Sequence, residues 1–410
     1  MTAAPAVDAA EAAARREIEA ANRLAGRDAI RIGVLTPLTP PGDTSAGGLV
    51  ARGARLGAEY VHEHGGVRRR RVELVLQNDQ ETTLEEGMAA SAARGLRRLV
   101  DEQGVLAALG QWHLRTAGAV AETAEELGVP VFIENGHSTV TEGRRTVFRT
   151  YFSIADRVPL MLDFLASQGL RRLAVLVADT VFGLTTADEL ERYGRREHGM
   201  ELLRFDFPQE TVEDVRAELR QVREWAPDAI VNDGVIRTNY LFLAQAAELR
   251  LRPSVPMMVT FGFPMRSADF WRLAGPAGNG ILWPATRYRP SWDGLTEIGR
   301  WFTARYVERY RDFPPDTALS AFTDVTILAR ALEAAESDRR EELIEALEAQ
   351  EFQTWRGPVR FVRGPRHWHH TPPDLLLMQY QEVGQSFDEA AIVYPSAERT
   401  RPYRPPEELG

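Results

Sequence analysis

The sequence predicts an α/β protein of two lobes, each built around a parallel sheet. Short apolar runs alternate with amphipathic helical patterns in two consecutive series, at residues 30–133 and 173–283. Alternation of this kind is typical of βα units, which place their strands in parallel. A chain of 410 residues is also long for one ordinary hydrophobic core, which favours two domains over one.

The first series follows an Ala-rich stretch with helical character at residues 9–24. Its apolar face is mostly alanine, which buries little area, so we expect a solvated extension rather than a docking helix. The strands expected next are residues 30–35, 72–77, 105–109 and 131–133. The helices between them are residues 48–64, residues 83–103 and a stripe through Val120, Ala121, Ala124 and Leu127 that Gly128 ends.

The second series begins with a helix at residues 157–168, after residues 144–153 interrupt the pattern. Its expected strands are residues 173–177, 201–207, 229–231, 256–260 and 281–283, and its helices are residues 185–198, 212–225 and 239–249. The tail adds helices at 296–311, 318–335 and 339–349 and strands at 357–362 and 375–381, which suggests that the chain recrosses between lobes.

Three segments of the chain follow from these patterns. They are an N-terminal helical extension at residues 1–29, a first lobe at residues 30–150 and 285–355, and a second lobe at residues 151–284 and 356–405.

Composition excludes several classes of function. A net charge of −10 argues against general nucleic-acid binding. All 49 basic residues are arginine and there is no cysteine, which excludes Schiff-base lysines, the lysine of a phosphate-binding loop, disulfides and thiol nucleophiles. No window approaches the ~20 apolar residues of a membrane span. Residues 1–28 carry acids where a signal peptide needs an apolar core, so we expect a cytoplasmic chain or one whose export signal is not in this sequence.

Two polar loops stand out at residues 111–116 and 134–139, because each follows the carboxyl end of a predicted strand. Ligands of open parallel sheets bind at that edge. The first loop also opens a helix, whose first N–H groups have no intrahelical partner and can hold an anionic or strongly polar group.

The order of several motifs resembles type I periplasmic binding proteins, above all the leucine/isoleucine/valine-binding family and its amide-sensing relatives. The motifs are IRIGVLTPLT, GQWHLRTAGAVAETAEELGVP, VFRTYFS, LAVLVADTVFGL, YVERYRDFPPDTALSAFTDVTILARALEAA and GPVRFV. The resemblance implies two flavodoxin-like lobes with parallel sheets, joined by a three-crossing hinge that closes on a small ligand. It also implies ligand capture for an ABC importer, with no enzymatic activity.

The chain departs from the amino-acid-binding members of that family at several positions. Leu114 stands where the serine that holds the ligand carboxylate is expected, and Thr116 is the alternative hydroxyl for that role. An Ala-Thr pair is replaced by Gly136-His137, and a tyrosine by Phe182. The acid that pairs with the ligand ammonium aligns with Thr238, although Asp233 is nearby. Loss of the serine and the acid weakens the case for an α-amino acid ligand, because a desolvated ammonium without a partner costs several kcal/mol.

The expected ligand is a small carboxylate or amide whose flat or apolar part contacts aromatic side chains. The alternative is that these aromatic side chains only pack the interior. The candidate ligand-binding residues are Trp112, His113, Arg115, Thr116, Asn135, Gly136, His137, Ser138, Phe182, Asn232, Asp233, Thr238, Phe261 and Phe263.

Catalytic and metal sites are weaker hypotheses. Residues 136–140 nearly match the G-x-S-x-G nucleophile elbow around Ser138, but Val140 replaces the second glycine. The histidines of RHWHH lack an accompanying carboxylate or cysteine at ligand spacing. A zinc site from His113, Glu134 and His137 is possible, but we expect these histidines to bind ligand directly and to make binding pH-sensitive. We predict no catalytic residue, metal or cofactor.

The sequence therefore predicts a solute-binding protein of an ABC importer. The alternative is a cytoplasmic sensor that binds an amide-like molecule and regulates a partner protein. The expected partners are a small-molecule ligand and an ABC permease, with no nucleic acid and no direct membrane insertion. The resemblance implies a periplasmic or extracellular location, and the acidic N-terminus leaves a cytoplasmic one open.

Overall fold

The computed structural model describes residues 4–23, 25–40, 43–80, 87–267, 269–289, 291–365 and 368–409, without the side chains of residues 4–8 and of Phe263. The chain forms two compact units. Unit 1 comprises Met1–Ser153 and Trp292–Pro373, and unit 2 comprises Ile154–Ser291 and Asp374–Gly410. The backbone thus passes from one unit to the other three times.

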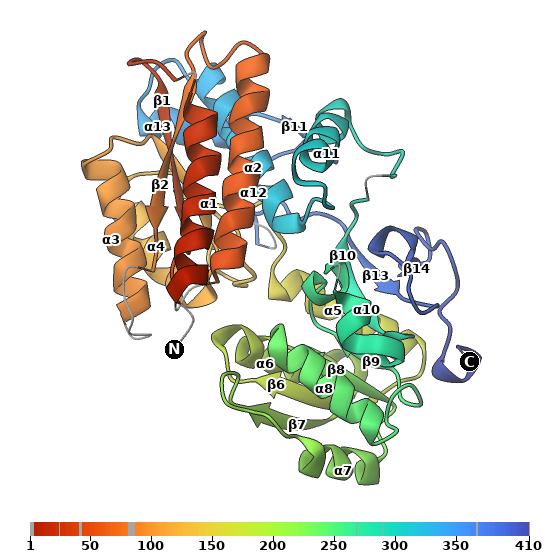
Figure 1. The fold of residues 1–410 in the computed structure, drawn as a ribbon. Helices are drawn as coiled ribbons and strands as arrows, with labels where there is room; N and C mark the ends of the chain where they lie inside the picture. The colour runs from red at the N-terminus through yellow and green to blue at the C-terminus, as the bar shows by residue number, and fades with distance from the viewer. Residues whose placement is uncertain are drawn as a thin grey trace. The chain divides into compact units, whose positions relative to one another are not determined.

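Unit 1 contains a parallel sheet of five strands in the order β2-β1-β3-β4-β5 (Figure 1). The strands are β1 (Ile30–Thr36), β2 (Val72–Asn78), β3 (Ala107–Gln111), β4 (Val131–Ile133) and β5 (Val147–Phe148). Successive side chains of a strand alternate between two hydrophobic clusters: Ile32 and Val34 of β1 belong to one cluster, and Leu35 belongs to the other. The sheet is therefore covered on both faces, as parallel sheets are.

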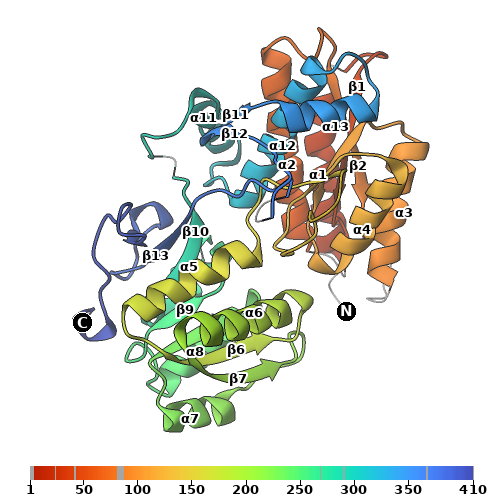
Figure 2. The same ribbon diagram turned by 180° about the vertical axis from the view of Figure 1, so that it is seen from behind.

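Helices supply both covers of this sheet (Figures 1 and 2). They are α1 (Ala4–Asn22), α2 (Thr44–Glu63), α3 (Met88–Asp101), α4 (Leu114–Leu127), α12 (Asp316–Ala334) and α13 (Arg340–Ala349). A short antiparallel pair, β11 (Phe352–Thr354) and β12 (Gly357–Val359), follows α13. Helix α11 (Glu297–Tyr310) packs against α2 and β11 instead. The start of the helix expected at residues 83–103 lies outside the described residues.

Unit 2 contains a mostly parallel sheet of seven strands in the order β14-β13-β10-β9-β8-β6-β7. The strands are β6 (Arg172–Ala178), β7 (Glu201–Phe207), β8 (Ala229–Asp233), β9 (Met257–Val259), β10 (Leu282–Thr286), β13 (Leu375–Gln379) and β14 (Ala391–Tyr394). The last two strands are antiparallel to their neighbours. The helices are α5 (Ile154–Ser167), α6 (Val181–His198), α7 (Arg216–Trp225), α8 (Arg237–Glu248), α9 (Phe263–Arg266) and α10 (Phe270–Ala274).

The predicted α/β fold with two parallel-sheet lobes is confirmed, while three details differ. Strands β5, β11 and β14 have no counterpart in the sequence prediction, because each is only two to four residues long. Residues 285–291, which the sequence assigns to the first lobe, lie in unit 2, and residues 356–373, which it assigns to the second, lie in unit 1.

The N-terminal helix α1 docks on unit 1, so the expectation of a solvated extension is wrong. Ala14, Ile18 and Ala21 are buried in the same cluster as the strand residues. The Asn22 side chain donates to the Leu74 carbonyl and accepts from the Leu74 N–H, both at 2.8 Å. Glu17 accepts from Arg55 at 2.7 Å and from the Tyr310 hydroxyl at 2.8 Å. The small alanine side chains allow a close approach that offsets their limited area.

Close packing of α2 against α12 depends on glycine. A Cβ atom on Gly53 would lie 2.0 Å from the Ala318 carbonyl oxygen, and one on Gly57 would lie 2.7 Å from the Val325 Cβ. By contrast, a Cβ on Gly48 of the same helix would meet nothing within 4 Å. The backbones of α2 and α12 therefore approach each other at a distance that only glycine permits at position 53.

We predict that Gly53→Ala destabilises unit 1 by about 1–3 kcal/mol, because the added methyl group overpacks a backbone contact. The matched control Gly48→Ala should be neutral or stabilising by up to about 1 kcal/mol, since alanine is the better helix former. Urea unfolding followed by circular dichroism measures both. Equal stability of the two variants would contradict the packing explanation.

Candidate ligand-binding site

The carboxyl edge of the unit 1 sheet carries a network of buried amide and hydroxyl groups. The Gln111 side-chain amide donates to the Thr116 hydroxyl and, at 2.7 Å, to the His113 carbonyl. The Asn135 amide donates to the Gln111 side-chain oxygen at 2.7 Å, which ties the loop after β4 to the loop after β3. The Thr116 hydroxyl also donates to the His113 carbonyl at 3.0 Å. Thr116 and Asn135, both predicted ligand contacts, thus form hydrogen bonds that hold the two loops in place.

His113 forms a hydrogen bond that holds two segments of unit 1 together. Its Nε2 accepts from the Asp43 N–H at 3.0 Å, which places the ring proton on Nδ1 and holds the loop before α2 against the start of α4. Burial lowers the pKa of His113, with a smaller lowering by Arg115 and an opposing effect of Asp43. The imidazole is therefore neutral at pH 7.

The loop of Gly136, His137 and Ser138 lies against a fully buried arginine, Arg149. Arg149 donates to the carbonyl oxygens of His137 and Asn135 and, at 3.0 Å, to Nδ1 of His370. Burial lowers the pKa of His137, and the nearby charge of Arg149 lowers it further. A neutral imidazole is the stable form at pH 7, which weakens the expectation that its protonation makes binding pH-sensitive.

The weaker sequence hypotheses find little support at these positions. Ser138 lies in an irregular loop followed by a turn rather than a helix, so the strand-turn-helix geometry of a nucleophile elbow does not form. His369 donates from Nε2 to the Glu348 carboxylate at 2.8 Å and stacks on Phe148, with ring centroids 4.3 Å apart. His367 lies outside the described residues. Among the described residues no three His, Cys, Asp or Glu side chains are grouped as a metal site.

Two further predicted residues lie on the outer part of this edge. Trp112 is half-buried and meets Tyr151 edge-to-face, with ring centroids 6.0 Å apart. Arg115 is exposed in the first turn of α4. Among the candidate residues of unit 1, Arg115 is the exposed one, and His113, His137 and Ser138 are partly buried like Trp112.

A pair of buried carboxyl groups, Glu134 and Asp324, lies beneath the loops of unit 1. The Thr150 hydroxyl donates to Asp324 at 2.6 Å. Neither Glu134 oxygen, nor the second Asp324 oxygen, has a hydrogen-bond partner in the part of the chain that the structure describes. Burial raises the pKa of Asp324 to about 8, and burial together with the Asp324 charge raises the pKa of Glu134 well above its usual value. Asp79 at the tip of β2 is likewise buried, with its pKa raised to about 7.

The sequence contains a feature that indicates the burial of Asp324, and the sequence analysis did not use it. It is the one acid within residues 317–329, a stretch of small and apolar side chains in α12. A lone acid in such a stretch is buried when the helix is buried on all sides, as α12 is.

The carboxyl edge of the unit 2 sheet combines aromatic rings with a buried arginine. Phe182 at the start of α6 and Phe261 after β9 meet edge-to-face, with centroids 5.7 Å apart. The Arg157 guanidinium lies 5.0 Å from the Phe182 ring centroid and donates to the Thr186 hydroxyl at 3.3 Å. Arg157 is only 2% exposed. The sequence prediction treated Arg157 merely as the start of a helix and missed it as a site residue.

Asp233 at the tip of β8 belongs to the same edge. It is fully buried and accepts from the Thr260 hydroxyl. Burial raises its pKa to about 8, and the opposing effects of Thr260 and of the Arg157 and Arg204 charges are smaller. Asp233 is therefore mostly protonated at pH 7.

Asn232 near the end of β8 and Thr238 in the first turn of α8, also predicted as ligand contacts, are fully buried on either side of the loop that joins these two elements. Asn232 donates to the Asn239 carbonyl at 3.0 Å. Thr238 donates to the Gln209 side chain at 2.7 Å and accepts from the Val235 N–H at 2.8 Å. Both side chains hold this loop in place. Phe263 begins α9, and its side chain lies outside the described part of the chain.

We predict that Asp324→Asn makes stability less dependent on pH. The unfolded chain loses the Asp324 proton near pH 4, whereas the folded chain keeps it until about pH 8. The contribution of this group to stability is thus full below pH 4 and is lost as pH rises to 8, with a slope of up to about 1.4 kcal/mol per pH unit. Urea unfolding at a series of pH values measures the difference from the parent chain.

The exposed Glu345 supplies the matched control for this experiment, because Glu345→Gln removes an acid on the surface of the same unit. Its stability profile should follow that of the parent chain. An Asp324→Asn profile that is parallel to the parent from pH 4 to pH 8 would show that Asp324 ionises freely when folded.

Comparisons with known proteins agree on the family. A model described as periplasmic binding protein matches residues 29–385. An ABC transporter substrate-binding protein from Sphaerobacter thermophilus is similar, with a TM-score of 0.74, 23% identity, and 92% of this chain and 99% of that chain covered. A leucine-binding protein from Thermotoga maritima has a TM-score of 0.73 and 23% identity, with 88% of this chain and 97% of that chain covered. An R. palustris solute-binding protein in complex with benzoate has a TM-score of 0.70 and 19% identity, with 89% of this chain and 95% of that chain covered.

No curated protein matches the chain. Among the described residues, no helix has the length and apolar character needed to cross a membrane. The family match spans most of the sequence, and the solved structures share the two-unit fold. The chain therefore belongs to the periplasmic binding protein family, and its fold is similar to that of leucine- and branched-chain amino acid-binding proteins of ABC transporters.

Proposed function

We propose that this protein captures a small organic carboxylate with a flat or apolar part and passes it to an ABC importer. Membership of the periplasmic binding protein family supports the general role of solute binding. In the proposal the strand-tip loops of both units contact the ligand, and the units close on it by hinge motion. The proposal also places the protein outside the cytoplasmic membrane, where an importer collects its solute.

The observation that carries the proposal is the arginine against the aromatic pair in unit 2. A guanidinium donates two parallel hydrogen bonds to a carboxylate, and the interaction is strong where water is excluded, as around Arg157. Phe182 and Phe261 offer ring faces and edges to a flat ligand. Two solute-binding proteins of similar fold were solved with benzoate and with 3,4-dihydroxybenzoic acid, which are carboxylates with a flat ring.

An α-amino acid fits the same groups poorly. Its ammonium needs a carboxylate or several free acceptors. Asp233 is mostly protonated at pH 7, since its pKa is about 8. The hydroxyls of Thr116 and Thr238 are already engaged with their own loops. Leu114 at the expected serine position adds no polar group.

We predict that calorimetry detects binding of benzoate or phenylacetate, and much weaker binding of benzamide and leucine. Arg157→Gln should weaken carboxylate binding at least about tenfold, because it removes a charge-assisted hydrogen bond. Arg223→Gln, at an exposed arginine of α7, is the matched control and should bind like the parent chain.

Because Arg157 is buried, its replacement can disturb the fold, so a second variant that keeps the arginine is needed. Phe182→Leu leaves the arginine in place and should weaken binding of aromatic carboxylates more than that of butanoate, since only the former use the ring. Thermal unfolding establishes that each variant is folded. Leucine binding tighter than that of every carboxylate would contradict the proposed ligand class.

We further predict that a saturating carboxylate lowers the radius of gyration in small-angle X-ray scattering. Hinge closure brings two domains together around a ligand, so the bound chain should be more compact. Arg157→Gln at the same ligand concentration should keep the scattering curve of the free chain. Superimposable curves for free and saturated parent chain would exclude closure, even if calorimetry shows binding.

A further inference from the structure

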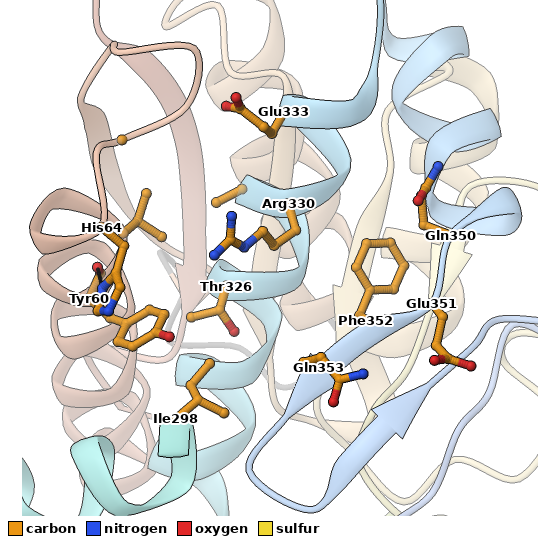
Figure 3. Close-up of a pocket in the computed structure, with 13 residues that line it drawn as sticks. Tyr60, His64, Ile298, Thr326, Arg330, Glu333, Gln350, Glu351, Phe352 and Gln353 are labelled. Carbon is orange, nitrogen blue, oxygen red and sulfur yellow. Dashed lines mark hydrogen bonds between the residues drawn. The ribbon is translucent and has the colours of Figure 1, made fainter. Parts of the chain in front are cut away.

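Unit 1 contains a cavity of about 330 Å³ that is distinct from the strand-tip loops. Its lining comes from the last residues of α2, the start of α11, the second half of α12 and the segment that enters β11 (Figure 3). Helix α2 begins at Thr44, beside the carboxyl end of β1, and reaches the cavity at Tyr60, about 24 Å further along its axis. The cavity therefore lies toward the opposite edge of the sheet, where β2 begins.

The floor of this cavity is apolar and buried. The floor residues are Val61, Ile298, Thr326, Ala329 and Phe352, each less than 9% exposed. Figure 3 shows the Phe352 ring and the Ile298 side chain directed into the space between α2 and β11. A volume of this size, with an apolar floor, is within the range of sites for small molecules.

Two polar groups on the cavity wall are available to a ligand. Arg330 is exposed, and its guanidinium forms no hydrogen bond or ion pair within the described part of the chain. Figure 3 shows it extending from α12 toward Tyr60 and His64. The Tyr60 hydroxyl likewise has no hydrogen-bond partner among the described residues. Burial raises the pKa of Tyr60, so its hydroxyl remains a donor at neutral pH.

The Tyr60 ring is held in a fixed position beside Arg330. It stacks on His64, with ring centroids 4.0 Å apart, and meets Trp301 edge-to-face at 5.1 Å. His64 is itself fixed by a 2.7 Å hydrogen bond from Nδ1 to the Tyr60 carbonyl. The phenol is thus preorganised next to a cation, which reduces the entropy lost on binding an anion.

The rim of the cavity limits the charge of the ligand. Glu333 and Glu351 are exposed at the rim, and Glu333 already accepts from the Arg68 N–H. Two nearby carboxylates repel a polyanion such as a phosphate ester more than a single negative charge. The two acids thus disfavour a polyanion, and the single cation, Arg330, can pair with one carboxylate.

We propose that this cavity is a second binding site, which takes a small monocarboxylate with an apolar tail. The carboxylate binds Arg330 and the Tyr60 hydroxyl, and the tail lies on Ile298, Thr326 and Phe352. This site is separate from the proposed transport ligand site, and a negative result for either site leaves the proposal for the other unaffected.

The test uses methyl NMR of the full chain labelled at isoleucine, with 3-phenylpropanoate as probe. The Ile298 methyl reports the cavity, while Ile133 and Ile236 report the strand-tip edges of units 1 and 2. Ile298 should shift in a saturable manner with 3-phenylpropanoate and not with 3-phenylpropanamide, which lacks the charge. Shifts confined to Ile133 or Ile236, or equal binding of the amide, would overturn the proposal.

Variants then assign the contacts. Arg330→Gln should weaken the Ile298 titration about tenfold or more, and Tyr60→Phe should weaken it by a smaller factor while keeping the ring. Arg94→Gln, at an exposed arginine of α3 that does not line the cavity, is the control and should leave the titration unchanged. Arg157→Gln should also leave it unchanged, which separates this site from the one in unit 2. An Ile298 titration that Arg330→Gln does not weaken would overturn the assignment.

Discussion

The crossover connection between parallel strands is the constraint on which this structure depends. Each helix of a βα unit returns the backbone to the amino end of the sheet, so every strand tip and the loop after it face the same edge. In unit 1 this gathers Gln111, Asn135 and Asp79 at one edge, and in unit 2 it gathers Asp233 and Phe261. Functional groups from distant parts of the sequence converge because the topology allows no other arrangement.

The same constraint buries polar groups, and the chain satisfies them in two ways. Amides and hydroxyls pair with each other and with loop carbonyls, as Gln111 and Thr116 do. Buried acids without a counter-ion have raised pKa values, because the charged carboxylate is costly to bury. Buried arginines keep their charge, as Arg149 does, and carbonyl oxygens and His370 accept its hydrogen bonds. Most polar side chains at these edges therefore stabilise the loops, and few remain for a ligand.

Much of the fold could be predicted from the sequence, since its buried strands are short apolar runs ended by glycine or polar residues. The docking of α1 could not, because an alanine face looks the same whether it packs closely or faces water. The candidate site was predictable as a set of loops rather than as a set of contacts. A polar residue that follows a strand tip, such as Thr238 in the first turn of α8, has the same sequence signature whether it holds the preceding loop in place or binds a solute. Arg157 was missed because its burial arises from packing between distant segments.

The pairing of Asn22 with Leu74 has a consequence for self-association. Strand β2 is the outermost strand of its sheet, and such a strand exposes backbone groups that can recruit a strand from another molecule. The Asn22 amide occupies both groups of Leu74 as a neighbouring strand would, and α1 lies along the same border. The alanine-rich helix, which the sequence analysis expects to be solvated, thus covers part of the edge through which two chains could pair.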